Sequence, residues 1–224
     1  MARFRDHEKA LILRREGKSY SQIKKILGIS KSTLSYWLKD YPLSAQRIRE
    51  LRDWNEQRIE KCRETKRKKK EKRLKDIYQE QKRLIFPFRT REFYLAGLFL
   101  YWGEGSKSHP NMLSISNTDP SIIKFFITWL TKSLKVPREK LKVHLHLYKD
   151  MNIQKEIQFW SKNLKTPQNQ FNKPYIKKSS SETINHKGAF GHGTCNVGLG
   201  DARLSEKVLM AIKAITDKYN KMRT

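Results

Sequence analysis

The spacing of hydrophobic residues changes along the chain, and these changes predict where helices and strands form. In residues 1–43 apolar residues recur every three or four positions, which is typical of amphipathic helices. Gly17 and Gly28 are expected to end helices, and Ser19 and Ser30 are expected to begin them, because glycine and serine favour these ends. The pattern predicts three short helices, over residues 6–16, 20–27 and 31–39.

Residues 44–88 have a different pattern, because charged residues dominate and neither glycine nor proline occurs from Ser44 to Leu84. Apolar residues three or four positions apart predict a long helix, or two helices on either side of the basic run 66–73. Two alternatives stay open, which are a coiled coil through the apolar stripe and a solvated linker over residues 63–73.

Residues 89–224 alternate between strand and helix patterns. The clearest strand is 141–149, which places apolar residues on one face and Lys142, His144, His146 and Tyr148 on the other. Further strands are expected at 112–116, 171–178 and 193–200, and helices at 93–104, 120–134, 153–164 and 202–221. This order predicts an α+β layer in which one sheet is backed by helices.

The chain is strongly basic, with 49 lysine and arginine residues, 22 aspartate and glutamate residues and a formal charge of +27 over 224 residues. Residues 1–91 hold 28 basic and 12 acidic residues (+16), and residues 92–224 hold 21 and 10 (+11). This charge predicts a polyanionic partner. No apolar run approaches the ~18 residues of a membrane span. We therefore expect a cytoplasmic protein that binds neither a membrane nor a small-molecule substrate.

The second and third predicted helices form a pattern of their own, because Gly28 separates them and Ile29 and Leu34 lie beneath the turn. This pattern resembles the helix-turn-helix module of recombinases and transposases over residues 5–41. The resemblance implies that the last helix enters the major groove of DNA. The residues that would contact DNA are Lys31, Ser32, Thr33, Ser35, Tyr36 and Lys39. The alternative is a small helical hairpin with an incidental basic face.

The most distinctive stretch is residues 93–107, in which eleven uncharged residues are followed by an acid between two glycines. At about 100° per residue, Ala96, Gly97, Gly103 and Glu104 fall on one narrow face of a helix. Small residues on a stripe permit close approach of another helix, so two copies crossing there would bring two carboxylates together. The alternative is a buried helix that ends at a Gly-Glu-Gly turn.

Leu95-Ala96-Gly97-Leu98 followed by Gly103-Glu104-Gly105 resembles the signature helix of the LAGLIDADG family, which includes homing endonucleases and DNA-binding regulators. The resemblance implies a saddle-shaped antiparallel sheet backed by helices over about residues 92–220. Because the chain has a single signature helix, it implies a homodimer whose two helices meet through Ala96, Gly97, Leu100 and Gly103. It also implies that Glu104 is the catalytic residue and a ligand of a divalent metal ion, Mg²⁺.

Other basic residues are expected to contact the DNA backbone. In the linker these are Lys66, Arg67, Lys68, Lys69 and Lys70, and in the second domain they are Lys107, Lys142, His144, His146, Lys173, Lys177 and Lys178. The spacing of the two histidines would alternatively suit a metal ion. His186, His192 and Cys195 give a weaker zinc signal, since a single cysteine without paired spacing is a poor zinc motif. Asp201 is expected to cap the last helix rather than to serve as a second acid.

Together these patterns predict a sequence-specific double-stranded DNA-binding protein with three parts. They are a helix-turn-helix domain at 1–43, a long basic helical linker at 44–88 and a LAGLIDADG-like α+β domain at 89–224. The first hypothesis is a homodimeric homing endonuclease that hydrolyses DNA phosphodiester bonds with a divalent metal. The second is a non-cleaving regulator on the same scaffold. It is favoured by the scarcity of acids near Glu104 and by a motif two residues longer than that of the family.

Overall fold

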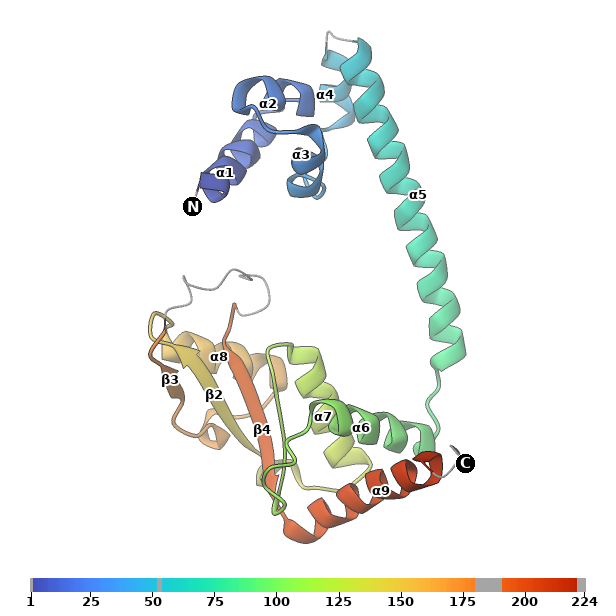
Figure 1. Cartoon of the computed structure of the whole chain (residues 1–224), viewed down its shortest axis with the longest axis vertical. Helices are drawn as coiled ribbons and strands as arrows, with labels where there is room; N and C mark the ends of the chain where they lie inside the picture. Colours follow the sequence, from blue (N-terminus) through green and yellow to red (C-terminus); the bar gives the residue numbers. More distant parts are fainter. Residues whose placement is uncertain (1, 52–53, 180–190, 221–224) are drawn as a thin grey trace. The chain divides into compact units, whose positions relative to one another are not determined.

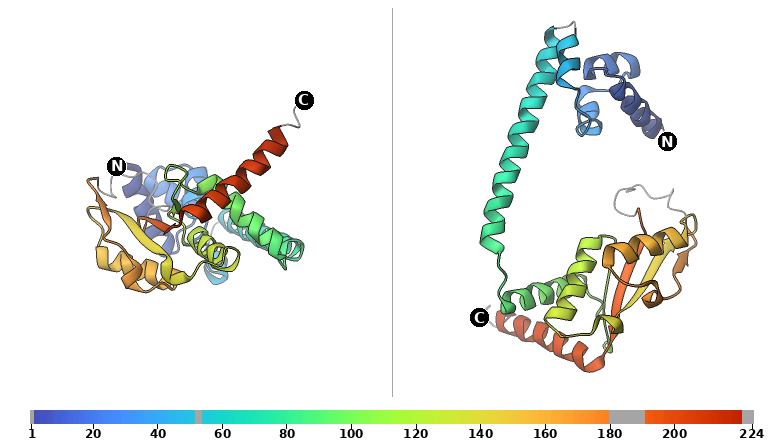
Figure 2. Two further views of the ribbon diagram at one scale, coloured as in Figure 1. Left: turned by 90° about the horizontal axis from the view of Figure 1, so that it is seen from below. Right: turned by 180° about the vertical axis from the view of Figure 1, so that it is seen from behind.

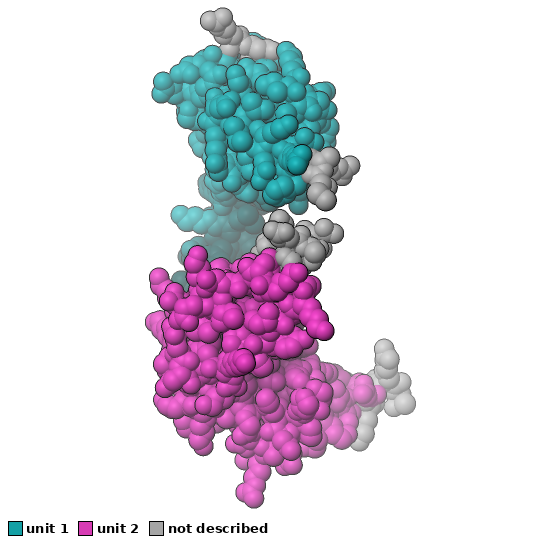
Figure 3. Space-filling view, turned by 90° about the vertical axis from the view of Figure 1, so that its left-hand side faces the viewer, with its two compact units in different colours: residues 1–87 teal, residues 88–224 magenta. Residues whose placement is uncertain are grey.

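A computed structural model of the chain describes residues 2–51, 54–179 and 191–220 (Figure 1). They form two compact units, residues 1–87 and residues 88–224, which have different colours in Figure 3. Within the described residues the first unit is helical, and the second combines helices with a four-stranded mixed sheet. The predicted α+β class is therefore confirmed.

Three short helices begin the first unit, and their ends follow from local sequence. They are α1 (Ala2–Arg15), α2 (Tyr20–Leu27) and α3 (Lys31–Trp37). Ser19 forms a capping box with Gln22 at the start of α2, and Gly28 ends this helix with a left-handed φ of 69°. The Ser30 side chain accepts a hydrogen bond from the Thr33 backbone amide, at 3.2 Å. These predicted helix ends are confirmed: side-chain oxygens of Ser19 and Ser30 satisfy free amides at the two starts, and the left-handed Gly28 ends α2.

Helix α4 (Ala45–Glu50) is followed by α5 (Trp54–Ile85), which is one helix of 32 residues. The basic run 66–73 lies inside α5, so the prediction of one long helix is confirmed over that of two helices, and most of residues 63–73 are exposed to solvent. Two ion pairs, each between residues one turn apart in the sequence, support this stretch; one joins Lys68 and Glu64 and the other joins Arg67 and Glu71.

The beginning of α5 makes polar contacts with α1 and with the start of α2. Buried Glu60 accepts hydrogen bonds from Arg14 at 3.0 and 3.4 Å, and buried Glu56 accepts one from the Ser19 hydroxyl at 2.8 Å. The Arg63 guanidinium lies 3.8 Å from the centre of the Tyr20 ring. These polar contacts join the start of α5 to α1 and to the start of α2, within the same compact unit.

The second unit begins with the predicted signature helix, and helices and strands then alternate. The helices are α6 (Thr90–Glu104), α7 (Pro120–Lys132), α8 (Ile153–Leu164) and α9 (Ala202–Asn220), with 3₁₀ turns at Arg138–Lys140 and Gln168–Gln170. The strands are β1 (Met112–Asn117), β2 (Lys142–Tyr148), β3 (Tyr175–Lys177) and β4 (Thr194–Gly200). No helix in the described part of the chain is long and apolar enough to cross a membrane.

The four strands form one sheet in the order β1-β4-β2-β3. Strand β4 is antiparallel to both β1 and β2, whereas β2 and β3 are parallel. The expected fully antiparallel sheet is therefore wrong for the β2–β3 pair. The reason is the helix α8 between them, because a helical crossover returns the chain in the same direction and gives a parallel pair.

One face of the sheet forms the core of the second unit. Val143, Leu145 and Leu147 of β2 are buried, as the alternation of this strand predicts. Helices α7 and α8 lie on this face of the sheet (Figures 1 and 2). Their fully buried residues include Trp129 and Trp160, and the core continues into α6 and α9. The opposite face carries the polar residues of the strands.

Helix α6 packs inside the second unit through the residue expected to meet a second copy. A Cβ atom on Gly97 would lie 2.0 Å from two ring carbons of Trp129 on α7, and Gly97 is buried. The Trp129 indole nitrogen donates a hydrogen bond to the Tyr94 carbonyl oxygen at 3.0 Å. The expectation that Gly97 faces a partner helix is therefore corrected, because α7 of the same chain occupies that space.

Gly97→Ala should destabilise the second unit, because the new methyl group overlaps the Trp129 ring. We expect a net loss of about 1–3 kcal/mol of unfolding free energy, typical of overpacked cores. Gly103→Ala is the matched control on the same helix, since nothing lies within 4 Å of its Cβ position. It should gain up to about 1 kcal/mol from helix propensity. Urea unfolding checks both variants, and equal effects would contradict the Gly97–Trp129 contact.

Candidate nucleic-acid interface

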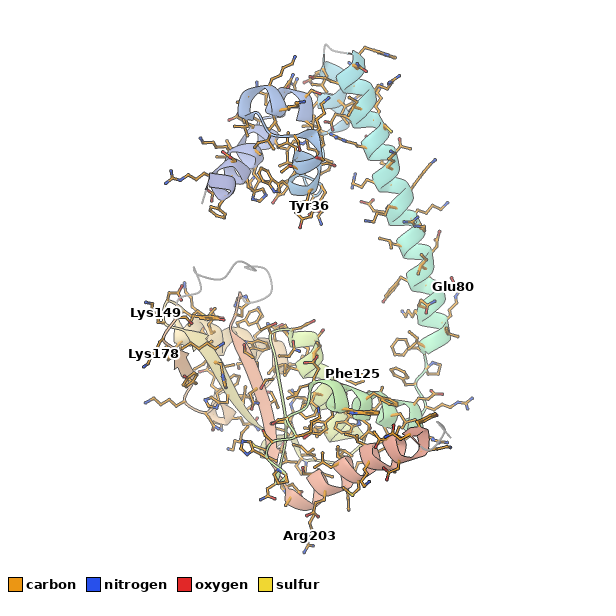
Figure 4. The ribbon with its side chains drawn as sticks, viewed as in Figure 1. Tyr36, Glu80, Phe125, Lys149, Lys178 and Arg203 are labelled. Carbon is orange, nitrogen blue, oxygen red and sulfur yellow. The ribbon has the colours of Figure 1, made fainter. Side chains whose placement is uncertain are left out.

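Helix α3 presents a polar surface away from the core of the first unit. Leu34 is buried, whereas Ser32, Tyr36 and Lys39 are exposed. Tyr36 is 74% exposed and projects from the end of α3 (Figure 4). The remaining predicted contact residues are half-buried, and these are Lys31, Thr33 and Ser35. Fewer of the predicted DNA-contact residues are therefore fully exposed than the sequence suggested.

The basic run of α5 is exposed along most of its length. Lys66, Lys68, Lys69 and Lys70 are exposed, and Arg67 is half-buried. Arg67 and Lys68 have glutamate partners on the same helix, at 2.8 and 3.0 Å. Lys66, Lys69 and Lys70 make no ion pair within the described residues, so their charges are available to an anion.

The polar face of the sheet brings together side chains from all four strands. Lys142, His144 and His146 of β2 lie on this face, with both histidines half-buried. The register places Asn196 of β4 between His144 and Ser116 of β1. The Asn196 amide donates a hydrogen bond to the Ser116 hydroxyl at 2.8 Å. The face thus combines cationic groups with uncharged hydrogen-bonding groups.

Strand β3 extends this face beyond the histidines. Tyr175 pairs with His146 in the sheet, and their ring centres are 5.5 Å apart. Lys177 pairs with Tyr148, and its ammonium nitrogen lies 4.8 Å from the Tyr148 ring centre. Tyr148 is only 8% exposed, although the alternation of β2 predicts an outward position.

The two histidines are close enough to influence one another. Their ring centres are 5.2 Å apart. Burial lowers the pKa of His146 from its ordinary value, and His144 and Lys177 lower it further because they are positive neighbours. Without an anion on this face His146 is therefore neutral near pH 7, and an anion placed there would favour its protonated form.

The remaining predicted lysines of the second unit differ in their surroundings. Lys173 and Lys178 are exposed, and Lys178 projects outward beside Lys149 (Figure 4). Lys149 is a basic residue at the end of β2 that the sequence reading left out of the candidate surface. Lys107 is exposed, but its ammonium group donates a hydrogen bond to the Trp102 carbonyl oxygen at 2.5 Å. It therefore also stabilises the end of α6.

Glu104 is exposed at the last position of α6, where a tight turn fixes the backbone. Gly105 forms a bridge to Ile115 of β1, and a side chain there would overlap the Tyr101 ring. The Asn117 side-chain amide donates a hydrogen bond to Glu104 Oε2 at 3.3 Å. This turn holds the carboxylate at the edge of the sheet.

Within the described residues, no three aspartate, glutamate, histidine or cysteine side chains lie close enough together to form a metal site. Asp201 caps α9, because its carboxylate accepts a hydrogen bond from the Leu204 backbone amide at 3.0 Å. The expected capping role of Asp201 is confirmed. Each chain thus offers Glu104 as a single exposed carboxylate at the end of α6.

The weaker zinc hypothesis is not supported by the residues that the structure describes. His192 makes a 2.7 Å contact with Glu156 and stacks on Phe159, with 3.5 Å between ring centres. Cys195 is buried within β4, and burial raises the pKa of its thiol, which disfavours a metal-binding thiolate. His186 lies outside the described residues.

The exposed surface of α6 is aromatic and differs from the expected small-residue face. Phe99 and Trp102 are 50% and 37% exposed, and their rings stack with centres 5.9 Å apart. Among the residues of the expected small-residue face, Gly103 is exposed, whereas Ala96 and Leu100 are half-buried. The sequence reading missed this aromatic pair, although its spacing of three residues already places both rings on one side of a helix.

No model of a known protein family matches the chain, and comparisons with curated proteins and with solved structures find no match either. The resemblances to helix-turn-helix and LAGLIDADG proteins therefore stay predictions. Function is inferred from the side chains of the two units.

Proposed function

We propose that this protein binds double-stranded DNA sequence-specifically and acts as a homodimer. The observation that carries the proposal is the placement of charge. Each unit presents basic and hydrogen-bonding side chains outside its apolar core, in a chain with a net charge of +27. DNA phosphates would neutralise such surfaces, and release of their counterions would favour binding.

In the first unit, α2, the Gly28 turn and α3 would act as a helix-turn-helix motif. Helix α3 would lie in the major groove with its exposed residues against the bases. Ser32 and Tyr36 are the exposed uncharged residues on that side, and Lys39 would contact a phosphate. Serine and tyrosine discriminate bases less strongly than a bidentate arginine or asparagine does, so α3 would supply only part of the specificity.

In the second unit, the polar face of the sheet would contact the DNA backbone. Lys142 and Lys177 would neutralise phosphates, and Asn196 and Ser116 would donate or accept hydrogen bonds. This arrangement would resemble the DNA-binding saddle of LAGLIDADG proteins. A homodimer would double the number of contacts.

The exposed aromatic pair of α6 supports the homodimer. Phe99 and Trp102 are large apolar side chains that remain accessible in one chain. Aromatic residues of this kind are enriched at protein interfaces. Two copies of α6 would bury them in an isologous contact, and the two Glu104 residues would lie at the ends of the paired helices.

The DNA-binding proposal predicts a steep loss of affinity with salt. Fluorescence anisotropy with a selected duplex should give a log–log salt slope of about −0.9 per neutralised phosphate. Lys142→Gln/Lys177→Gln should weaken binding to every sequence and reduce the slope by about two. Ser32→Ala/Tyr36→Ala should instead change the preference among sequences, because these residues would face bases.

The matched control for the lysine pair is Lys155→Gln/Lys162→Gln, which removes the same charge from exposed positions on α8. Helix α8 packs on the opposite face of the sheet. If this variant weakened DNA binding as much as Lys142→Gln/Lys177→Gln, total charge alone would explain binding. The polar face would then not be the binding surface.

DNA affinity should also depend on pH through the paired histidines. DNA phosphates stabilise the imidazolium form, so the pKa of His146 should be higher in the complex than in the free protein. Binding would then take up protons and strengthen as pH falls from about 8 to 5.5. Each fully linked proton would change the affinity about tenfold per pH unit.

His144→Gln/His146→Gln should flatten this pH dependence while leaving binding at pH 8 nearly unchanged. The control is His109→Gln, which removes an exposed histidine outside the sheet. Dissociation constants measured at constant ionic strength across the pH range give the comparison. If the double variant kept the pH dependence of the wild-type protein, contact between these two histidines and DNA phosphates would be ruled out.

DNA cleavage is the second candidate function, and the exposed position of Glu104 favours it. In a homodimer, Glu104 of each chain would hold Mg²⁺. The ion would supply positive charge beside the phosphodiester that reacts. A single chain offers only one such carboxylate, so this function depends on the dimer.

The Glu104→Gln variant tests whether the protein is an endonuclease or a non-cleaving DNA-binding regulator. If the protein is an endonuclease, the wild-type protein should cleave a bound duplex with Mg²⁺, and Glu104→Gln should bind it without cleaving. Glu206→Gln on α9 is the control for loss of an exposed glutamate. Wild-type protein that binds a selected duplex tightly but never cleaves it with Mg²⁺ would be the DNA-binding regulator.

A further inference from the structure

The first unit contains a cavity that the DNA-binding surfaces do not explain. It has a volume of about 460 Å³ and lies between α5 and the segment from α3 to α4. Its apolar lining includes Tyr20, Leu43 and Ile48, and its polar lining comes mostly from α5. A cavity of this size can hold a small molecule or one group of a larger ligand.

Two arginines share one carboxylate beside this cavity. Arg14 binds buried Glu60 through two hydrogen bonds, at 3.0 and 3.4 Å. Arg63 reaches the same carboxylate only at 3.8 Å, which is too long for a hydrogen bond. The two guanidinium groups and one carboxylate therefore leave a net positive charge at the wall of the cavity.

Arginine donors beside the cavity lack acceptors. Among the described residues, Arg63 Nη1 and Arg67 Nε are buried and have no hydrogen-bond partner. Burial lowers the pKa of Arg63, and the attraction of Glu60 only partly opposes this effect. A buried donor without an acceptor is costly, so an anion that reached these groups would be favoured.

The rim of the cavity adds further positive charge. Lys39 follows the end of α3, and Lys66 and Lys70 come from α5; none of them forms an ion pair within the described residues. The acids of the lining are Asp40, Glu60, Glu64 and Glu71. Glu60, Glu64 and Glu71 already bind Arg14, Lys68 and Arg67. Lysines therefore approach the opening from both sides.

We propose that this cavity binds the phosphate group of a ligand. Arginine guanidinium groups match phosphate oxygens in geometry, and lysines add charge without strict geometry. The phosphate would belong either to the DNA strand beside α3 or to a free phosphorylated molecule whose apolar part packs on Leu43 and Ile48. The site does not depend on the proposed function, because a free phosphate probe tests it without DNA.

Isothermal titration of the full-length protein with inorganic pyrophosphate, at constant ionic strength, tests the site. The wild-type protein should bind one pyrophosphate per chain at this site. Arg63→Gln, verified as folded by circular dichroism, should weaken binding about tenfold or more, because a charge-assisted hydrogen bond is lost. Lys66→Gln/Lys70→Gln changes exposed rim residues, so it should weaken binding without affecting folding.

The matched control is Lys69→Gln/Lys72→Gln, which removes the same charge from exposed positions of α5 outside the cavity lining. It should bind pyrophosphate nearly as well as the wild-type protein. The proposal is overturned if the two lysine pairs weaken binding equally, or if folded Arg63→Gln binds like the wild-type protein. Either result would mean that pyrophosphate binds through the overall charge of the protein rather than at this cavity.

A competition experiment identifies the source of the phosphate. If the DNA backbone fills the cavity, a saturating duplex should abolish pyrophosphate binding at this site in the wild-type protein. If a free phosphorylated molecule fills it, duplex and pyrophosphate should bind together. Failure to bind any duplex would contradict the proposed function but leave the phosphate site intact.

Discussion

The second unit depends on the close contact between Gly97 and the indole of Trp129. Only a residue without a side chain leaves room for the ring, which also donates a hydrogen bond to the Tyr94 carbonyl oxygen. This contact fixes α6 against α7 and turns the opposite side of α6, with Phe99 and Trp102, toward solvent. The place of the proposed homodimer contact and the exposure of Glu104 at the end of α6 both depend on how this helix packs against α7.

The first unit depends on a different kind of contact, because its small apolar core is supplemented by buried polar groups. Glu60 holds Arg14, and Arg14 also donates to the Tyr41 carbonyl oxygen, so one ion pair links α5, α1 and the segment after α3. Removing one member of such a pair would leave a buried charge and cost about 3–5 kcal/mol. The same carboxylate cannot also satisfy Arg63. This stabilising contact thus leaves Arg63 Nη1 without a hydrogen-bond partner, and this donor contributes to the proposed anion site.

The sequence predicted features that depend on local patterns. Alternation identified the core and polar faces around Val143 and His144, and serine and glycine positions identified the ends of α2 and α3. The sequence did not predict which helix would pack against Gly97, because a small residue permits close approach but does not determine which helix approaches. The parallel pairing of β3 was also missed, although the helix α8 before it was predicted and a helical crossover favours that direction.

Specific DNA binding by this chain would require its two units to act together. The exposed uncharged residues of α3, Ser32 and Tyr36, would offer weak discrimination between bases, and the lysines of the sheet face would contact phosphates that are the same in every sequence. Linking such sites in one chain turns the second binding event into an intramolecular one. Two moderate surfaces then give high total affinity, and a wrong base at α3 weakens the whole complex. Homodimerisation would extend the same effect to four surfaces, which makes strong base contacts at any one of them unnecessary.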